Sequence, residues 1–547
     1  MLKALSSSSS IAALSWAESL AWYAMCVMMT YLTNVWKLDL TQAAAIVNVF
    51  TGAANIMPIA MSVLADAYLG HYCMVLLANL AYSFGLSFLA MSTLAVVSDD
   101  TGNCRGYKPD CIGDTQKALF FTALVLIAVG KSGNLTSIKS FRDQQQMEIK
   151  EVERKMPWKL AGMLAVILLP IFGGIALPFI KPWSVRFGIP AICTIAATLL
   201  FMSGSSSYTH HQPQGSPLTT VSRVFVASAS KIFCHLPQDA NQLYEKHQPS
   251  EGLRFVPHTR SLRFLDKAAI IVPTQTVEHQ QQSRWKLCRV TEVEETKIFI
   301  RMIPMWMTFT MWGVVSSIGE TYFLEQANHM NRKVGKLKVP LTMLPIFYKI
   351  AKSTLAKLYV KVGEKFTEKG SGKYVAPVGN IAAMLFSVLC CITAAKMETM
   401  RLEVIKNHML LDKPNQKIPM SMFWLLPQFL FLGALDGISG KSIPDFFTSQ
   451  VPASMRPLME IFTWLAFGAG TMGSVLSVYV VGKISEERGK PSWFQDTLNK
   501  SHLNNYYWVL TIWSSINLVL YILVAIRYPY QDPPRGRVDL NQVDELL

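Results

Sequence analysis

Three ionisable residues interrupt long apolar stretches of the sequence: Glu18, Lys131 and Asp445. A charged side chain is costly inside a bilayer, so it is usually retained where it faces a partner or a wet cavity. Tyr23 follows Glu18 by five residues, which places the two on broadly similar faces of a helix. Each of these residues is therefore a candidate functional residue.

Other kinds of chemistry find no support in the sequence. It contains no Ser/His/Asp set, no His-Glu-x-x-His motif and no phosphate-binding loop, so we expect no enzymatic activity. Its ten histidines show no metal-ligand spacing, and we assign no metal and no cofactor. The net charge of +15 has no accompanying zinc-finger or RNA-binding motif. We therefore expect a lipid bilayer as the partner and no nucleic acid.

The composition is that of a membrane protein. Of the 547 residues, 51% are apolar and 16% are charged, and the mean hydropathy is +0.27. Soluble domains carry about 25% charged residues. A helix needs about 20 apolar residues to cross a bilayer. Ten charge-free windows meet this need: Ser19–Trp36, Leu40–Ala65, Tyr72–Ser98, Leu160–Ile180, Phe187–Gly204, Met302–Gly319, Tyr374–Ala395, Ile418–Leu435, Ile461–Gly482 and Leu503–Ile526.

Two further stretches are long enough to span but carry charge. Ala118–Ile138 contains Lys131, and Val339–Val362 contains four lysines. The second stretch is read either as a helix on the membrane surface or as a spanning helix whose lysines face a wet cavity. With both counted as spans the total is twelve, which divides into six and six.

The longest hydrophilic interval separates the two sets of spans. We expect a bundle of six helices in residues 1–205, a cytosolic central loop at 206–296, and a second bundle of six with a short tail in 297–547. Basic residues cluster near the end of the loop, as cytosolic loops prefer, although Arg332 and Lys333 fall in a loop that this topology sends outward. Cys104 and Cys111 share another outward loop, where a disulfide and two free thiols are equally expected.

Motifs along nearly the whole chain resemble the plant nitrate/peptide transporter family, the plant branch of the proton-dependent oligopeptide transporters in the major facilitator superfamily. Their order and spacing carry the resemblance. The motifs are Leu64-Ala-Asp66-Ala-Tyr68-Leu-Gly70, Phe187-Gly-Ile-Pro190, Leu262-Arg263-Phe-Leu-Asp266-Lys267, Trp285-Lys-Leu-Cys288, Arg301-Met-Ile-Pro304-Met-Trp306, Phe423-Trp424-Leu-Leu-Pro427-Gln428, Gly433-Ala-Leu-Asp436 and Trp493-Phe-Gln-Asp496.

This resemblance implies an all-α integral membrane protein with the major facilitator fold. It implies a central cavity and alternating access by rocking of the two bundles. It also implies substrates among nitrate, short peptides, other small anions and plant hormones. Members of the family occupy the plasma membrane and the vacuolar membrane, and either is open for this chain.

The chain departs from the family at the first-helix motif Glu-x-x-Glu-Arg, a carboxylate cluster that takes up protons and balances an arginine. Glu18 keeps the second carboxylate, but Ser15 and Ser19 stand where the first carboxylate and the arginine belong. Proton coupling is therefore expected to be weak or absent. The family lysine of the fourth helix would fall at Leu135. Lys131 lies one turn earlier on the same face, where it either serves the cavity or reaches to the interface.

The resemblance assigns gate roles to other residues. Asp445 corresponds to a carboxylate that pairs with a cation across the cavity, and Asp436 and Lys441 are candidates for the same network. Asp66, Tyr68 and Gly70 form the turn between the second and third helices, with His71 where the family usually has Arg or Lys. In the seventh helix Ser316 and Ile318 stand near the family's polar cavity position, and Glu320 is expected at the rim.

The leading hypothesis is a secondary transporter of nitrate or another small solute that works by alternating access. It runs either as a weakly proton-coupled symporter or as a uniporter. The alternative is a transporter-derived receptor or scaffold that binds solute without moving it, because several motif positions have changed together.

Overall fold

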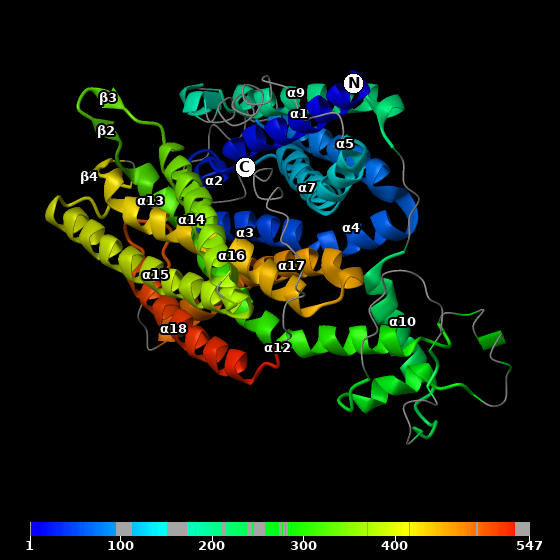
Figure 1. Cartoon of the computed structure of the whole chain (residues 1–547). Helices are drawn as coiled ribbons and strands as arrows, with labels where there is room; N and C mark the ends of the chain where they lie inside the picture. Colours follow the sequence, from blue (N-terminus) through cyan, green and yellow to red (C-terminus); the bar gives the residue numbers. More distant parts are fainter. Residues whose placement is uncertain are drawn as a thin grey trace.

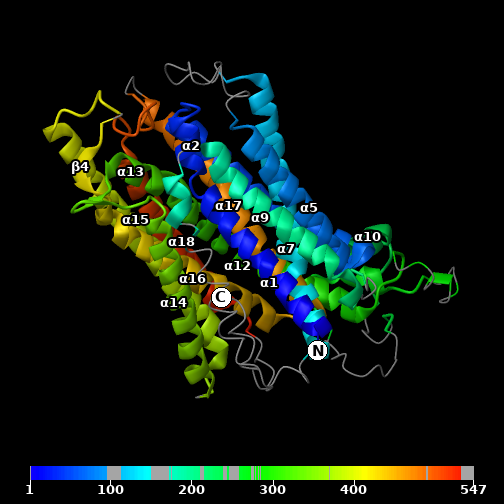
Figure 2. The same ribbon diagram turned by 90° about the horizontal axis from the view of Figure 1, so that it is seen from above.

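The computed structural model is a bundle of long helices that run in a broadly common direction (Figure 1, Figure 2). It describes residues 2–94, 112–149, 182–209, 215–237, 258–272, 285–368, 370–414, 416–487 and 491–530, with short pieces between 172 and 180, 243 and 245, and 276 and 283. Most of the fifth expected span, Leu160–Ile180, lies outside the described residues, which include only 172–173 and 175–180 of it, and Cys104 and Cys111 lie outside them too.

The first half of the chain supplies one group of helices. Their bounds are α1 (Leu2–Met25), α2 (Met28–Asn34), α3 (Leu40–Ile56), α4 (Pro58–Leu64), the π-helix η1 (Ala65–Leu69), α5 (Gly70–Met91), α7 (Asp114–Ile149), the short turn η5 (Leu177–Phe179) and α9 (Trp183–Ser203). Extensive contacts join α5 to α7 and to α9, and α1 to α9. These packed pairs form the N-terminal bundle.

The second half supplies the other group. Its elements are α12 (Val290–Ile318), the π-helix η9 (Gly319–Phe323), α13 (Leu324–His329), α14 (Met343–Glu368), η10 (Gly372–Tyr374), α15 (Val375–Asn407), η11 (Met422–Leu425), α16 (Leu426–Gln450), η12 (Ala453–Met455), α17 (Arg456–Glu486) and α18 (Leu503–Arg527). Two small sheets lie beside α13: β1 (Met330–Asn331) pairs in parallel with β4 (Ile418–Ser421), and β2 (Lys333–Val334) is antiparallel to β3 (Leu337–Lys338).

Nine stretches of the described chain are long and apolar enough to cross a membrane, and one of them, Leu40–Met91, contains both α3 and α5. The lysine-rich α14 is not among the nine. It nevertheless packs lengthwise against α16, which is the arrangement expected of a spanning helix. An added Cβ at Gly433 would lie 2.7 Å from the Tyr348 carbonyl oxygen, and one at Gly437 only 2.3 Å from that of Lys352. Small residues permit this close approach of the two backbones.

The segment between the bundles is partly folded. It contains η6 (Ser205–Ser207), α10 (Pro217–Ser230) and η8 (Arg263–Ala269). Val224 and Ala227 of α10 pack with Leu265 and Ala268 of η8, and with Val293 at the start of α12, in a small core of their own. Part of the expected central loop is therefore a compact structure that is docked on the end of the second bundle.

The two bundles meet along α3 and α17, and α2 contacts α13 near the end of the molecule that is remote from α10. Asn48 of α3 donates a hydrogen bond to Ser474 of α17, with 3.1 Å between Nδ2 and Oγ. Trp306 and Phe462, which stack with ring centroids 5.5 Å apart, join α12 to α17 within the second bundle. These contacts leave a cavity between the halves, which holds the candidate site.

Candidate transport cavity

A cavity with about 580 Å³ of empty space, partly open to solvent, lies between the bundles. Three of its lining residues are ionisable and come from three elements: Glu18 from α1, Lys131 from α7 and Glu320 from η9. Most of the others are apolar. The remaining lining residues are Trp22, Met25, Cys26, Met28, Val47, Phe50, Thr51, Tyr82 and Ile127. The structure thus places both Glu18 and Lys131 at this cavity, which is the first of the two positions considered for Lys131.

Glu320 also lines this cavity, although the sequence placed it at the rim. It belongs to η9, the π-helical segment that interrupts the seventh span. Lys131 and Lys352 exert favourable Coulomb interactions on Glu320, and Trp22 contributes a hydrogen bond. The sequence placed Glu320 near the far end of the seventh span, whereas the π-helical turn η9 brings its side chain to the cavity wall.

Lys349 of α14 lies beside the cavity carboxylate of the first helix. Its Nζ is 4.7 Å from the ring centroid of Trp22 and 4.8 Å from that of Tyr23. Lys349 and Lys131 are the two cations that act favourably on Glu18. Tyr23 is 1% exposed and is not among the lining residues. Tyr23 therefore packs against the cation that faces Glu18 instead of contributing its hydroxyl to the cavity wall.

Asp436 accepts hydrogen bonds from three neutral donors on two neighbouring helices. The donors are Trp312 Nε1 at 2.6 Å, Ser316 Oγ at 2.5 Å and Tyr348 OH at 2.5 Å. The carboxylate is buried, with 4% of the residue exposed. These three donors supply the hydrogen bonds that a buried carboxyl group needs. Asp436 consequently links α12, α14 and α16.

Asp445 lies further along α16, with Tyr359 of α14 as its hydrogen-bond donor at 3.1 Å. The cation that acts on Asp445 is Lys441 of the same helix. Among the described residues, the contacts of Asp445 with Tyr359 and Lys441 stay within the second bundle. The structure thus keeps Asp445 and Lys441 near each other.

A different pair joins the bundles at this end. Lys139 of α7 and Glu460 of α17 form a salt bridge of 2.9 Å, with 47% and 43% of their side chains exposed. Both residues also interact electrostatically with Lys441. The sequence did not single out either residue. Lys139 follows one expected span and Glu460 precedes another, so both were taken as ordinary charges at the ends of spans. Their pairing becomes visible only when the two halves are placed together.

The opposite end of the cavity is closed by buried contacts. Thr33 of α2 donates a hydrogen bond to Glu325 of α13, with 3.0 Å between Oγ1 and Oε1, and Glu325 is 2% exposed. His329 lies 3.2 Å from the same oxygen. Lys417 donates to the Asn328 carbonyl at the end of α13. Burial and the positive charge of Arg332 lower the pKa of Lys417 to about 8.

The turn between α4 and α5 contains Asp66, Tyr68 and Gly70. His71 Nε2 lies 3.8 Å from Asp66 Oδ1, so the histidine takes the partner position expected of a basic residue. Tyr68 is 75% exposed. Gly70 has a φ of 75°, which glycine adopts without the Cβ clash of other residues. The Asp66 carbonyl also accepts from the Gly215 N–H at 3.0 Å, which ties the turn to the segment before α10.

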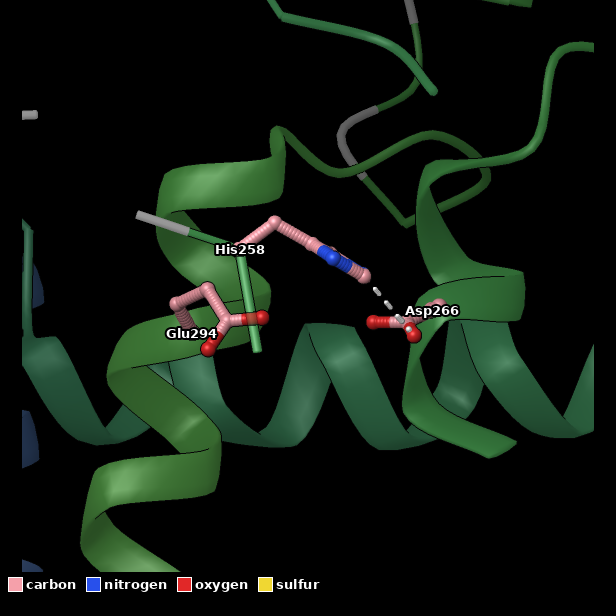
Figure 3. A group of neighbouring side chains, drawn as sticks. All are labelled: His258, Asp266 and Glu294. Atoms are coloured by element: carbon pink, nitrogen blue, oxygen red, sulfur yellow. Dashed lines mark hydrogen bonds and ion pairs between the residues drawn. The ribbon is translucent and has the colours of Figure 1, made fainter. Parts of the chain in front are cut away.

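Three potential metal ligands cluster at the start of α12: His258, Asp266 and Glu294 (Figure 3). Lys297 places its ammonium group 2.6 Å from Asp266 Oδ1 and 2.7 Å from Glu294 Oε1. His258 lies 3.2 Å from Asp266 Oδ2. The lysine therefore supplies the cation that the two carboxylates require, and the cluster is an ion network that fixes η8 against α12.

The helical bundles and the cavity between them define an all-α integral membrane transporter of the major facilitator type. A family model described as the POT family matches residues 72–497. The chain belongs to this family.

Curated relatives and solved structures agree with this assignment. The chain is 41% identical over 535 residues to Protein NRT1/ PTR FAMILY 5.5 of Arabidopsis thaliana, covering 96% of this chain and 98% of the relative. It is 32% identical to Protein NRT1/ PTR FAMILY 5.6 of the same plant, covering 96% and 92%. Its fold resembles that of the POT family transporter PepTSo, with a TM-score of 0.64 at 17% identity, covering 96% and 98%.

Proposed function

We propose that the protein carries nitrate or another small anion across the membrane together with protons, by alternating access of the cavity to the two sides. The observation that carries this proposal is the set of charges at the cavity. Lys131, Lys349 and Lys352 act there on Glu18 and Glu320. Asp436 also acts on Glu320, so three carboxylates face three lysines, and the site gains a positive surplus for an anion when one carboxylate binds a proton.

Asp436 accepts hydrogen bonds from Trp312, Ser316 and Tyr348, whereas Glu18 and Glu320 line the cavity itself. A proton that binds to Glu18 or Glu320 removes a negative charge and increases the attraction for an anion. Bound proton and bound anion then favour each other, which is the thermodynamic requirement for coupled movement.

Glu320 supports the coupled form of transport over the uniport that the altered first helix favours. Ser15 and Ser19 replace two charged groups of the family motif. Glu320 brings a carboxylate from the other bundle to the same cavity as Glu18. Ser15 instead accepts a hydrogen bond from Arg142 at 3.4 Å. We infer that the carboxylate pair is divided between the bundles in this chain.

Uptake of labelled nitrate by expressing oocytes, at an acidic and a neutral external pH, tests the proposal. We expect uptake above that of water-injected cells, with more uptake at acidic pH. Saturable nitrate binding without uptake would support the receptor alternative, and neither binding nor uptake of any small anion would defeat the proposed function. A fluorescent fusion imaged in plant cells distinguishes the plasma membrane from the vacuolar membrane.

A further inference from the structure

The helix α10 starts where the bundles end. Leu218 and Val221 contact the same apolar core as the membrane helices. The Gly215 N–H donates to the Asp66 carbonyl at the end of η1. Figure 1 draws α10 beside the ends of α4 and α12. The helix therefore lies close to the level at which these spans leave the bilayer.

One face of α10 is used for packing on the protein. Val221, Val224, Ala227 and Ser228 on this face are buried, and Lys231 in the turn that follows is buried too. Lys231 donates from Nζ to the Ile270 carbonyl at 2.6 Å. The internal contacts of the central segment thus account for this face completely.

Several apolar side chains are exposed on α10 and in the turn that follows it. Phe225 and Val226 of α10 are 43% and 49% exposed, and Ile232 and Phe233 in the turn are 59% and 95% exposed. Phe264 of η8 is 51% exposed, and its carbonyl accepts a hydrogen bond from Ser228 Oγ at 2.5 Å. We call these five residues the α10 patch. Neighbouring exposed apolar side chains of this kind mark an interaction or membrane surface, and they lie beside the exposed Ser222 and Ser230 of α10.

Basic side chains border the α10 patch. Arg263 and Lys267 flank Phe264 on η8, and Lys267 donates to the Ile232 carbonyl. The acidic residues nearby are engaged elsewhere: Asp266 pairs with Lys297, and Glu292 pairs with Arg289. Apolar side chains with a positive border match the boundary between acyl chains and anionic headgroups.

We propose that the α10 patch is an interfacial anchor that inserts into the lipid leaflet on the central-loop side. The aromatic side chains enter the boundary between headgroups and acyl chains, while Arg263 and Lys267 contact lipid phosphates. The bilayer is the occupant that fits, because α10 begins against the membrane core itself. Since η8 is bound to α12 through Lys297, the anchor fixes the start of the seventh span to the membrane surface.

Photocrosslinking of the full-length protein in lipid nanodiscs tests the anchor. The photoreactive benzoylphenylalanine replaces Phe233, and after irradiation adducts are identified by mass spectrometry. The matched control places it at Met409, which is 83% exposed in the loop after α15. We expect several-fold more lipid adduct at 233 than at 409. Equal lipid adduct at the two positions, or adducts to protein in place of lipid at 233, would overturn the proposal.

Hydrogen exchange provides a second measurement. Backbone amides of 217–233 should exchange several-fold more slowly when the nanodisc contains phosphatidylserine than when it contains phosphatidylcholine alone. Arg263→Gln should remove this difference, whereas Met409→Gln should leave it unchanged. Identical exchange in the two lipids for the unaltered protein would contradict the role of the basic border. None of these results depends on nitrate transport, so the anchor and the proposed function fail separately.

Discussion

At the scale of single residues, the cavity divides its charges between helices that belong to different halves of the molecule. Glu18 and Lys131 come from the first bundle, Glu320 from the second. Charged residues in a membrane interior are tolerated when they pair or face water. Each of these side chains depends on a partner that the other bundle or another helix supplies, so a single substitution should alter transport without unfolding the chain.

The first prediction concerns Glu320. Glu320→Gln keeps the size and hydrogen-bonding capacity of the side chain but cannot bind a proton. We expect the excess of nitrate uptake at acidic over neutral external pH to fall several-fold, because one of the two carboxylates that can bind the coupled proton is gone. Uptake assays at the two pH values measure this. Glu403→Gln on the exposed face of α15 serves as control and should keep the pH dependence. Retained pH dependence in Glu320→Gln would show that Glu320 is not the coupling group.

The second prediction concerns Lys349, whose ammonium group contacts the rings of Trp22 and Tyr23. Cation–π interactions in desolvated sites contribute about 1–2 kcal/mol. Lys349→Gln removes this interaction and one positive charge, so we expect KM for nitrate to rise about tenfold, the equivalent of about 1.4 kcal/mol. Concentration-dependent uptake measures KM. Lys357→Gln, on an exposed position of the same helix, should leave KM unchanged. An unchanged KM in Lys349→Gln would remove Lys349 from the binding site.

At the scale of the elements, the pair Lys139–Glu460 is the contact between α7 and α17 at the central-loop end. Exposed ion pairs contribute about 0.2–1 kcal/mol. Such a weak contact suits a gate that must open in each cycle. The Thr33–Glu325 hydrogen bond at the other end is of a different kind. Opening of this end would break the bond and leave the buried Glu325 without this partner, which is costly in a low-dielectric site.

The third prediction follows from this pair. Lys139→Glu places two carboxylates side by side and should disfavour closure at this end, which lowers uptake a few-fold. The double variant Lys139→Glu with Glu460→Lys restores opposite charges and should recover most of the uptake. Uptake rates of the four proteins form a double-mutant cycle. Additive losses in the double variant would show that the two residues do not act as a pair.

The helix bounds show how accurately the charge-free windows predicted the helices. The expected window Leu503–Ile526 agrees with α18 (Leu503–Arg527). The window Ile418–Leu435 was wrong at both ends, because β4 takes its first residues and α16 continues through Lys441 and Asp445 to Gln450. Likewise α12 begins at Val290, before the charged pair Glu294 and Lys297. Charge-free windows miss helix turns whose charges are paired or line a cavity.

At the scale of the whole molecule, the site residues fall into two groups. Some contact a residue nearby in the sequence, and others contact a residue in the other half of the chain. Asp66 and His71 are five residues apart and belong to one sequence motif, and their side chains lie 3.8 Å apart. Lys139–Glu460 and Thr33–Glu325 join residues about 300 positions apart, as the separations of 321 and 292 show. No local pattern encodes such pairs. These pairs form when the two bundles dock against each other. The sequence determines that docking only through the complete fold, so the pairs cannot be predicted from short motifs.

The last prediction tests this docking as a moving part. Alternating access requires each end of the cavity to open while the other is closed. The double variant Lys139→Cys with Glu460→Cys places a thiol on each bundle at an exposed position. A short bifunctional thiol reagent should join the bundles there and abolish uptake, and a linker that is cleaved by reduction should restore it. Each single cysteine variant, treated in the same way, controls for modification of the native thiols and should retain its uptake. Full uptake by the crosslinked double variant would mean that the two halves do not separate at this end during transport.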